Sequence, residues 1–352
     1  AGRATISGHA RRTRIEMENM DFAEPRASLN GTITLHQADE RLSIDLRGND
    51  ADVASLAPVL KGLFPEKNFT ESFDIVHQGR VPWARITASG RGKEALKADL
   101  QILGHLVEGE VTLPEPKMEL DRVRGTFHVV KNALSMNDLS ARFGRSRITS
   151  GRAALGFDDK NEKDDKVDPL SLYLEGRLDL SETSRLVGRT LDNPEFQRQL
   201  DRVETLRGRA EATFSFSKKG EDVKWGFDLR ELDLEAEHEA LPLPVSLSRG
   251  GLSYRQETLR FSDLRGRIGT SSIGRLEGEI RFDERPRMQL AGEQAEMILN
   301  ELGPALGELP AAPSWSGKIG LDTLRGRMDL ASFSLKGPLQ NPKKWDFEAQ
   351  GS

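Results

Sequence analysis

A long internal repeat is the feature of this sequence that most constrains its fold. Residues 138–146, D-L-S-A-R-F-G-R-S, match residues 263–271, D-L-R-G-R-I-G-T-S, without a gap. Upstream of this match, Gly125 and Gly250 keep the same offset of 125 residues. Short L-x-G strings also recur, but chance accounts for them more easily in a chain with 33 glycines. A pattern repeated at this distance predicts one supersecondary unit built more than once.

The apolar residues of each unit alternate with charged or hydroxyl-bearing ones. Leu170-x-Leu172-x-Leu174 is one example and Val223-x-Trp225-x-Phe227 is another. A period of two places these side chains on one face of a strand. Clean alternation is typical of an antiparallel sheet with one packed and one hydrated face. We therefore predict a mainly β protein with an antiparallel sheet.

The alternation slips by one position at the same place in both copies of the repeat. The run L-S-M-N-D-L over residues 134–139 shows the slip, and L-R-F-S-D-L over residues 259–264 repeats it. An extra residue in a strand produces such a slip and bends the strand. The slips predict tight bends or bulges at Asn137–Asp138 and Ser262–Asp263.

Helical signals are few, and they fall between the repeat units. Asn193 is a good N-cap and Pro194 suits the first helical position, which predicts a helix near residues 194–204. Further helices are expected over residues 53–63 and near 296–308, covering the sheet between units. The expected organisation is a partial unit with a terminal helix, two whole units and a partial unit, over residues 1–64, 65–192, 193–309 and 310–352.

The composition excludes several classes of protein. The 51 basic and 56 acidic side chains are interleaved, so no concentrated basic face is available for nucleic acid. The chain has no cysteine, which excludes disulfides and thiolate metal sites. It contains neither an apolar run of about 20 residues, the length of a membrane span, nor a signal segment. We expect an excised fragment or a mature piece of a longer protein.

No motif in the sequence indicates catalysis, a metal or a cofactor. The six histidines are scattered singly, and the chain has no nucleophile elbow, no Walker loop and no dinucleotide fingerprint. Ser146 and Ser271 follow glycines at equivalent places in the repeat, which favours a structural role over a catalytic one. The polar stretch 158–168 lacks the glycine and glutamate of a calcium loop and predicts a hydrated hairpin tip. We expect a protein that is not an enzyme and needs no cofactor.

A continuous sheet of this kind has an apolar face that water cannot cover at low cost. About 25 strands spaced by about 4.8 Å would extend roughly 100 Å, while soluble proteins rarely expose apolar patches beyond a few hundred Å². Three arrangements stay open: the sheet folds into sandwiches, it pairs with another chain, or it curls into a trough that holds acyl chains. The alternation does not choose between the first and the third.

The repeat resembles the AsmA-like, TamB-related proteins of the Gram-negative envelope, through Arg124-Gly125, Asp138-Leu139, Gly144 and Ser146 and their counterparts. The resemblance implies an elongated, curved antiparallel sheet that forms a half-pipe groove, with a few short helices between the units. It implies a periplasmic, inner-membrane-anchored protein that conducts phospholipid or another acyl-chain lipid between the two membranes. Inner- and outer-membrane proteins are further expected partners. The lack of an anchor departs from the family and agrees with a fragment.

In such a groove the alternating apolar residues solvate acyl chains, and lipid headgroups stay at the wet edge. The alternative for each residue is an ordinary core position that faces another layer. The candidate lining residues are Leu134, Met136, Phe143, Leu172, Leu174, Phe214, Phe216, Trp225, Phe227, Leu259, Phe261 and Ile268.

A second functional hypothesis uses the sheet edges instead of the apolar face. A structural or assembly factor would pair its exposed edges with strands of outer-membrane proteins. A carbohydrate-binding β protein is a weaker third hypothesis, because aromatic residues, which stack on sugars, make up only 6% of the chain.

Overall fold

Strands dominate the protein. The computed structural model describes residues 2–9, 11–23, 27–55, 75–113, 118–130, 133–156, 170–182, 194–239, 241–301, 325–341 and 344–352. Its strands pair antiparallel with their neighbours along the chain, in one 18-stranded sheet whose described edges do not close on each other. The predicted fold class, a mainly β protein built on an open antiparallel sheet with few short helices, is confirmed. The predicted hairpin tip at 158–168 lies outside the described residues.

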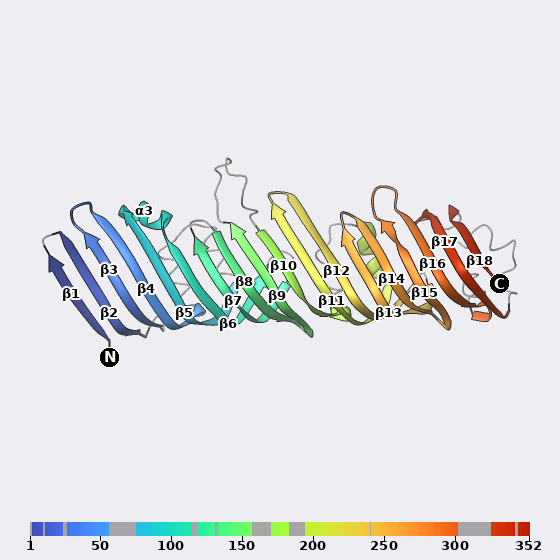
Figure 1. Ribbon diagram of the computed structural model, residues 1–352, viewed down its shortest axis with the longest axis horizontal. Coiled ribbons are helices and arrows are strands. Elements are labelled where there is room, and N and C mark those ends of the chain that lie inside the picture. Colours follow the sequence, from blue (N-terminus) through green and yellow to red (C-terminus); the bar gives the residue numbers. More distant parts are fainter. Residues whose placement is uncertain are drawn as a thin grey trace. The chain divides into compact units, whose positions relative to one another are not determined.

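The chain divides into two compact units, residues 1–174 with 215–224 and residues 175–214 with 225–352. In the first unit, nine strands follow one another as an antiparallel meander (Figure 1). They are β1 (Arg3–His9), β2 (Arg12–Phe22), β3 (Ala27–His36), β4 (Arg41–Asp52), β5 (Val76–Arg91), β6 (Gln101–Leu113), β7 (Met118–Val130), β8 (Ala133–Phe143) and β9 (Ser146–Gly156).

The second unit continues the same meander pattern. Three strands carry residues of both units: β10 (Leu170–Asp179), β11 (Val203–Lys219) and β12 (Asp222–His238). The strands that belong wholly to the second unit are β13 (Leu241–Arg255), β14 (Thr258–Ile268), β15 (Ser271–Arg281), β16 (Arg287–Ile298), β17 (Arg327–Pro338) and β18 (Asp346–Gly351).

A line of bends crosses neighbouring strands of the second unit. Glu231 in β12, Gly250 in β13 and Asp263 in β14 have positive φ angles of 48°, 114° and 46°. On one side of this line Leu229 of β12 faces Leu252 of β13, and the same two strands keep this register on the other side of the line. Each of these strands therefore carries its extra residue at the same level, so the bends match instead of shifting the pairing.

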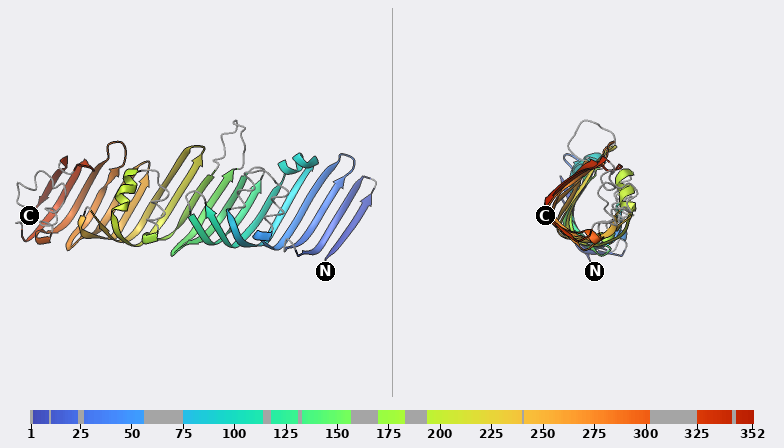
Figure 2. Two further views of the ribbon diagram at one scale, coloured as in Figure 1. Left: turned by 180° about the vertical axis from the view of Figure 1, so that it is seen from behind. Right: turned by 90° about the vertical axis from the view of Figure 1, so that its right-hand side faces the viewer.

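The first unit contains bends of the same kind. Glu108, Arg122 and Asp138, in β6, β7 and β8, have φ angles of 54°, 51° and 53°. The left-handed conformation at Asp138 and at Asp263 confirms the bends that the repeat predicts. Short polar residues such as aspartate tolerate this conformation better than most. Figure 2 shows the result in the strands of the second unit (yellow to red), which curve along their length.

The glycine and serine of the repeat occupy equivalent hairpin turns. Gly144 lies between β8 and β9, Gly269 lies between β14 and β15, and their φ angles are 54° and 58°. The serine that starts each following strand is buried, with Ser146 0% and Ser271 1% exposed. Ser271 Oγ accepts a hydrogen bond of 2.9 Å from the backbone N–H of Ile298. These contacts are those of a structural residue.

Two helices of a full turn or more are described. The α5 helix (Pro194–Asp201) forms where the Asn-Pro signal predicts it, but it ends before residue 204 because β11 begins at Val203. The α3 helix (Gly92–Ala98) follows β5 and was not predicted. Glu94 in its first turn and Lys97 in its last turn complement the helix dipole.

The prediction of a helix near residues 296–308 is wrong for its first residues. Residues 296–298 belong to β16, where Glu296 faces Asp329 and Ile298 faces Arg327 of β17. Pairing with a neighbouring strand here overrides the local helical signal. Residues 299–301 are helical, and 302–308 lie outside the described residues. Of the helix expected over residues 53–63, residues 53–55 are helical and residues 56–63 lie outside the described residues.

Candidate functional site

The bends keep the apolar side chains of each long strand on one face. In β12 the apolar residues before the bend are Trp225, Phe227 and Leu229, and the next one, Leu232, is out of alternation by one position. Because side chains alternate between faces, Leu232 would lie on the opposite face without the extra residue Glu231. From Trp225 to Ala236 the strand thereby presents one continuous apolar face.

The residues that follow the bends form the most deeply buried part of this face. Leu232 is 0% exposed, Leu264 2% and Val123 1%. Leu232 and Leu264 belong to one core cluster together with Ala210. Removing such side chains from water stabilises the sheet by about 1.5–3 kcal/mol each. The bend is therefore also the centre of the core.

An aromatic cluster lies on the same face of the second unit. Tyr254 is 3% exposed, and its ring centroid is 4.5 Å from that of Trp225 and 5.9 Å from that of Phe227. Phe282 completes the cluster, and Leu200 of α5 packs against it. The helix therefore lies on the apolar, concave side of these strands (Figure 2). Burial raises the pKa of the Tyr254 hydroxyl to about 12.

The first unit has a smaller apolar cluster built in the same way. Ile102 in β6 and Val129 in β7 face each other, and each is 7% exposed. Phe127 and Leu134 pack against them, with Ile86 of β5. Half-buried side chains thus surround a few buried ones across three or more strands.

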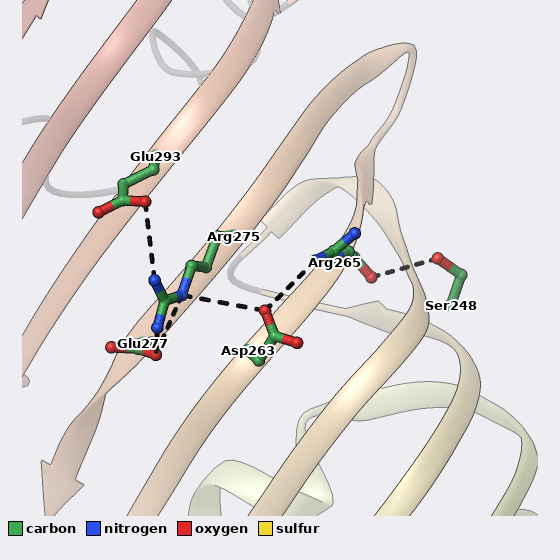
Figure 3. A network of polar contacts seen from close by, with 6 residues as sticks. All are labelled: Ser248, Asp263, Arg265, Arg275, Glu277 and Glu293. Carbon is green, nitrogen blue, oxygen red and sulfur yellow. Dashed lines mark hydrogen bonds and ion pairs between the residues drawn. The ribbon is translucent and has the colours of Figure 1, made fainter.

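The opposite face of the second unit is polar and cross-linked by ion pairs (Figure 3). Guanidinium nitrogens of Arg275 in β15 lie 2.6 Å from a carboxylate oxygen of Glu277, 3.8 Å from one of Glu293 in β16 and 3.9 Å from one of Asp263 in β14. Asp263 also lies 3.7 Å from Arg265. The hydrogen bond to Glu277 raises the pKa of the Arg275 guanidinium. The side chain of a bend residue is thus held on the hydrated face.

The first unit carries the same kind of polar face. Arg85 of β5 donates two hydrogen bonds of 3.0 Å to the carboxylate of Asp45 in β4. These bonds lower the pKa of the Asp45 carboxyl group. Both side chains are about half exposed. Exposed pairs contribute at most about 1 kcal/mol each to the free energy of unfolding. The charges of this face therefore keep it hydrated and help to hold the register of the strands, but most of the stability comes from elsewhere.

The candidate lining residues are all at least half-buried in the described structure, and several of them belong to the core clusters. Trp225, Phe227 and Leu259 join the aromatic cluster, Phe261 joins the cluster of Leu232, and Leu134 joins that of Ile102. Three candidates are buried, namely Leu172, Leu174 and Phe216. The half-buried candidates are Leu134, Met136, Phe143, Phe214, Trp225, Phe227, Leu259, Phe261 and Ile268.

The sequence reasoning missed the residues at the centre of the face. Leu139, Leu232 and Leu264 follow bends and are almost fully enclosed. The slip of alternation before Leu139 and Leu264 predicts a bend, but it does not predict that the leucine after the bend is enclosed. Tyr254 was missed because the residues around it, G-G-L-S-Y, give a weak strand signal.

Within the described ranges, no group of three or more metal-ligating side chains lies together. None of the helices within these ranges is both long enough and apolar enough to cross a bilayer.

Comparison with known proteins gives no match, whether against protein-family models, curated proteins or solved structures. The resemblance to AsmA-like proteins therefore stays an expectation from the repeat motif.

Proposed function

We propose that the apolar face of this sheet binds the acyl chains of phospholipid or a similar lipid. In this proposal the protein is a non-enzymatic conduit of the periplasm, and it shields acyl chains on their way between the inner and outer membranes. The observation that supports it best is the continuity of one apolar face past each bend. The periplasmic setting and the membrane partners come from the motif resemblance.

The chemistry of the face suits an acyl chain better than a polar ligand. Its half-buried side chains, such as Phe261 and Met136, offer contact area and no hydrogen-bonding groups. Each methylene removed from water contributes about 0.8 kcal/mol, and a flat row of apolar side chains makes no demand on the position of the methylenes. Charged headgroups would stay at the hydrated rim.

The half-burial of the candidates also bears on the proposal. Among the described residues no second sheet packs against the apolar face, whereas a sandwich would bury these side chains fully. Apolar surface that is only partly covered has a driving force to take up a ligand. This favours the trough over the sandwich among the arrangements left open by the sequence.

Site-specific photocrosslinking tests the proposal with the protein kept intact. Phe261→p-benzoylphenylalanine and Phe214→p-benzoylphenylalanine place the probe on the apolar face, where the benzoyl group extends the phenylalanine ring away from the backbone. The matched controls carry the probe at the adjacent residues Ser262 and Ser215, which are exposed and lie at the polar phase of the same strands. After irradiation with phospholipid vesicles, mass spectrometry measures lipid attached to each position.

We expect lipid adducts at the two phenylalanine positions and few at the serines. Equal labelling of both sets, or none in a protein whose circular dichroism is unchanged, would contradict binding on the apolar face. Stoichiometric lipid that co-purifies and is lost in Phe261→Asp but kept in Ser262→Asp would give independent support.

A further inference from the structure

The α5 helix contacts both ends of the β12–β13 strand pair in the second unit. Leu200 packs against the aromatic cluster, where Tyr254 faces Phe227 near one end of the pair. The preceding residue, Gln199, lies at the other end, where its carbonyl accepts a hydrogen bond of 3.2 Å from Nε2 of His238. Two adjacent residues of one short helix therefore reach both ends of the same two strands.

Only a curled sheet allows these two contacts. Phe227 and His238 belong to the same strand and would be about 36 Å apart if it were straight, at about 3.3 Å per residue. The helix has only eight residues and is therefore about 12 Å long. In the right view of Figure 2 the strands of this unit (yellow to red) curve round, and the helix lies at the open side of the curve. The α5 helix thus lies across the mouth of the trough in this unit.

The helix is anchored where it joins the sheet. The backbone N–H of Glu239 donates a hydrogen bond of 2.9 Å to the carbonyl of Arg202, just before β11 begins at Val203. Nε of Arg202 also lies 3.3 Å from a carboxylate oxygen of Glu239. These contacts fix the C-terminal end of α5 to the rim formed by the β12–β13 turn.

Over the trough, the helix takes the place of an acyl chain. Leu200 is half-buried and gives the cluster of Tyr254 and Phe282 an aliphatic contact, which is the contact that an acyl chain would make there. We propose that α5 is a gate on the acyl-chain site of the second unit. It covers the aromatic cluster while no lipid is bound, and it moves away when an acyl chain takes the position of Leu200. The gate rests on the proposed function, since it regulates the same apolar face.

Opening of the gate exchanges contacts of the same kind. The acyl chain restores to the rings the apolar contact that Leu200 gives up, and water can satisfy the Nε2–H of His238 and the carbonyl of Gln199. Because lipid binds at this cluster only when the helix is displaced, the measured affinity scales with the fraction of molecules in which α5 is open. A change that weakens the closed state should therefore strengthen lipid binding.

Distances between spin labels test the motion in the intact chain, which has no native cysteine to interfere. Arg198→Cys on α5 and Gln256→Cys in the β13–β14 turn give exposed labelling sites. The control pair, Glu235→Cys with Gln256→Cys, joins two positions of the sheet. With vesicles of phosphatidylethanolamine and phosphatidylglycerol, we expect the first distance to lengthen and the second to stay the same.

Photocrosslinking at Phe261 in the same samples separates the gate from the proposed function. Lipid attached at Phe261 while the distance from α5 stays unchanged would overturn the gate and leave lipid binding standing. Absence of crosslinking at Phe261 would remove the proposed function and the gate with it.

Leu200→Ala tests the competition between helix and lipid. It removes the contact of α5 with the aromatic rings, so crosslinking at Phe261 should reach half of its maximum at an about fivefold lower lipid concentration. Leu206→Ala is the matched control, because Leu206 is also half-buried but belongs to β11 and packs against the cluster of Leu232. It should not lower the lipid concentration required. An equal shift in the two variants, or a higher lipid requirement in Leu200→Ala, would refute the gate.

Discussion

Leu264→Ala is expected to loosen the core at the bend of the second unit. Leu264 is 2% exposed, faces Leu276 across the strand pair and belongs to the cluster of Leu232. Truncation of an enclosed leucine costs the transfer energy plus the cavity, about 3 kcal/mol. Leu259→Ala is the matched control, because Leu259 lies on the same strand and face but is only half-buried. We expect it to cost about 1 kcal/mol, mostly lost transfer energy.

Native-state hydrogen exchange of peptides from β12 to β15 measures the effect locally. A loss of about 3 kcal/mol lowers the protection of these amides by about 150-fold, whereas strands several positions away should change little because contacts run between neighbours. Lipid crosslinking at Phe214 should persist in Leu264→Ala. An effect of Leu264→Ala no larger than that of Leu259→Ala would refute the view that the bend is the centre of the core.

Three further predictions concern single residues. Gly250→Ala should lower the free energy of unfolding in urea by about 3 kcal/mol, because the φ of Gly250 is 114° and an added Cβ would lie 2.6 Å from a backbone oxygen. The control Gly220→Ala adds a Cβ in open space and should lower it by about 1 kcal/mol. Burial raises the pKa of the Tyr254 hydroxyl from 10.0 to about 12, so the unfolded chain loses this proton first and the free energy of unfolding should fall as pH rises through that range. Phenolate absorbance and urea unfolding at each pH measure the two effects. Ser271→Ala should cost about 1–2 kcal/mol in thermal unfolding, because the Ile298 N–H loses its acceptor.

The sheet and two of its bends could be predicted from the sequence. Alternation with a period of two gives the strands, and the repeated slip places the bends at Asp138 and Asp263 because one extra residue is the simplest way to keep leucines on one face. The bend at Glu231 has the same signal, since Leu229 and Leu232 are also out of phase, but this slip has no counterpart at the offset of the repeat that would distinguish it from chance.

Other features could not be predicted because they depend on contacts between distant residues. The start of the helix expected near 296 failed because β17 offers Glu296–Ile298 strand partners, which no local signal reveals. The α3 helix is only seven residues long and has no side-chain cap, so its sequence signal is weak. In the candidate site, alternation identified which residues share the apolar face, but not that Leu232 and Leu264 are its most enclosed members.

The matched bends have a consequence for how this sheet tolerates change. Deleting Asp263 would invert the facing of every later residue in β14, so that Arg265 and Arg267 would enter the apolar face and Leu264 and Ile268 would enter water. Restoring the pattern would require the same deletion in β13 and in β15, because β14 pairs with each of them in the same register before and after the bend. Insertions and deletions are therefore compatible with the hairpin loops but not with the strand middles, and the curvature is a collective property that single mutational steps cannot remove.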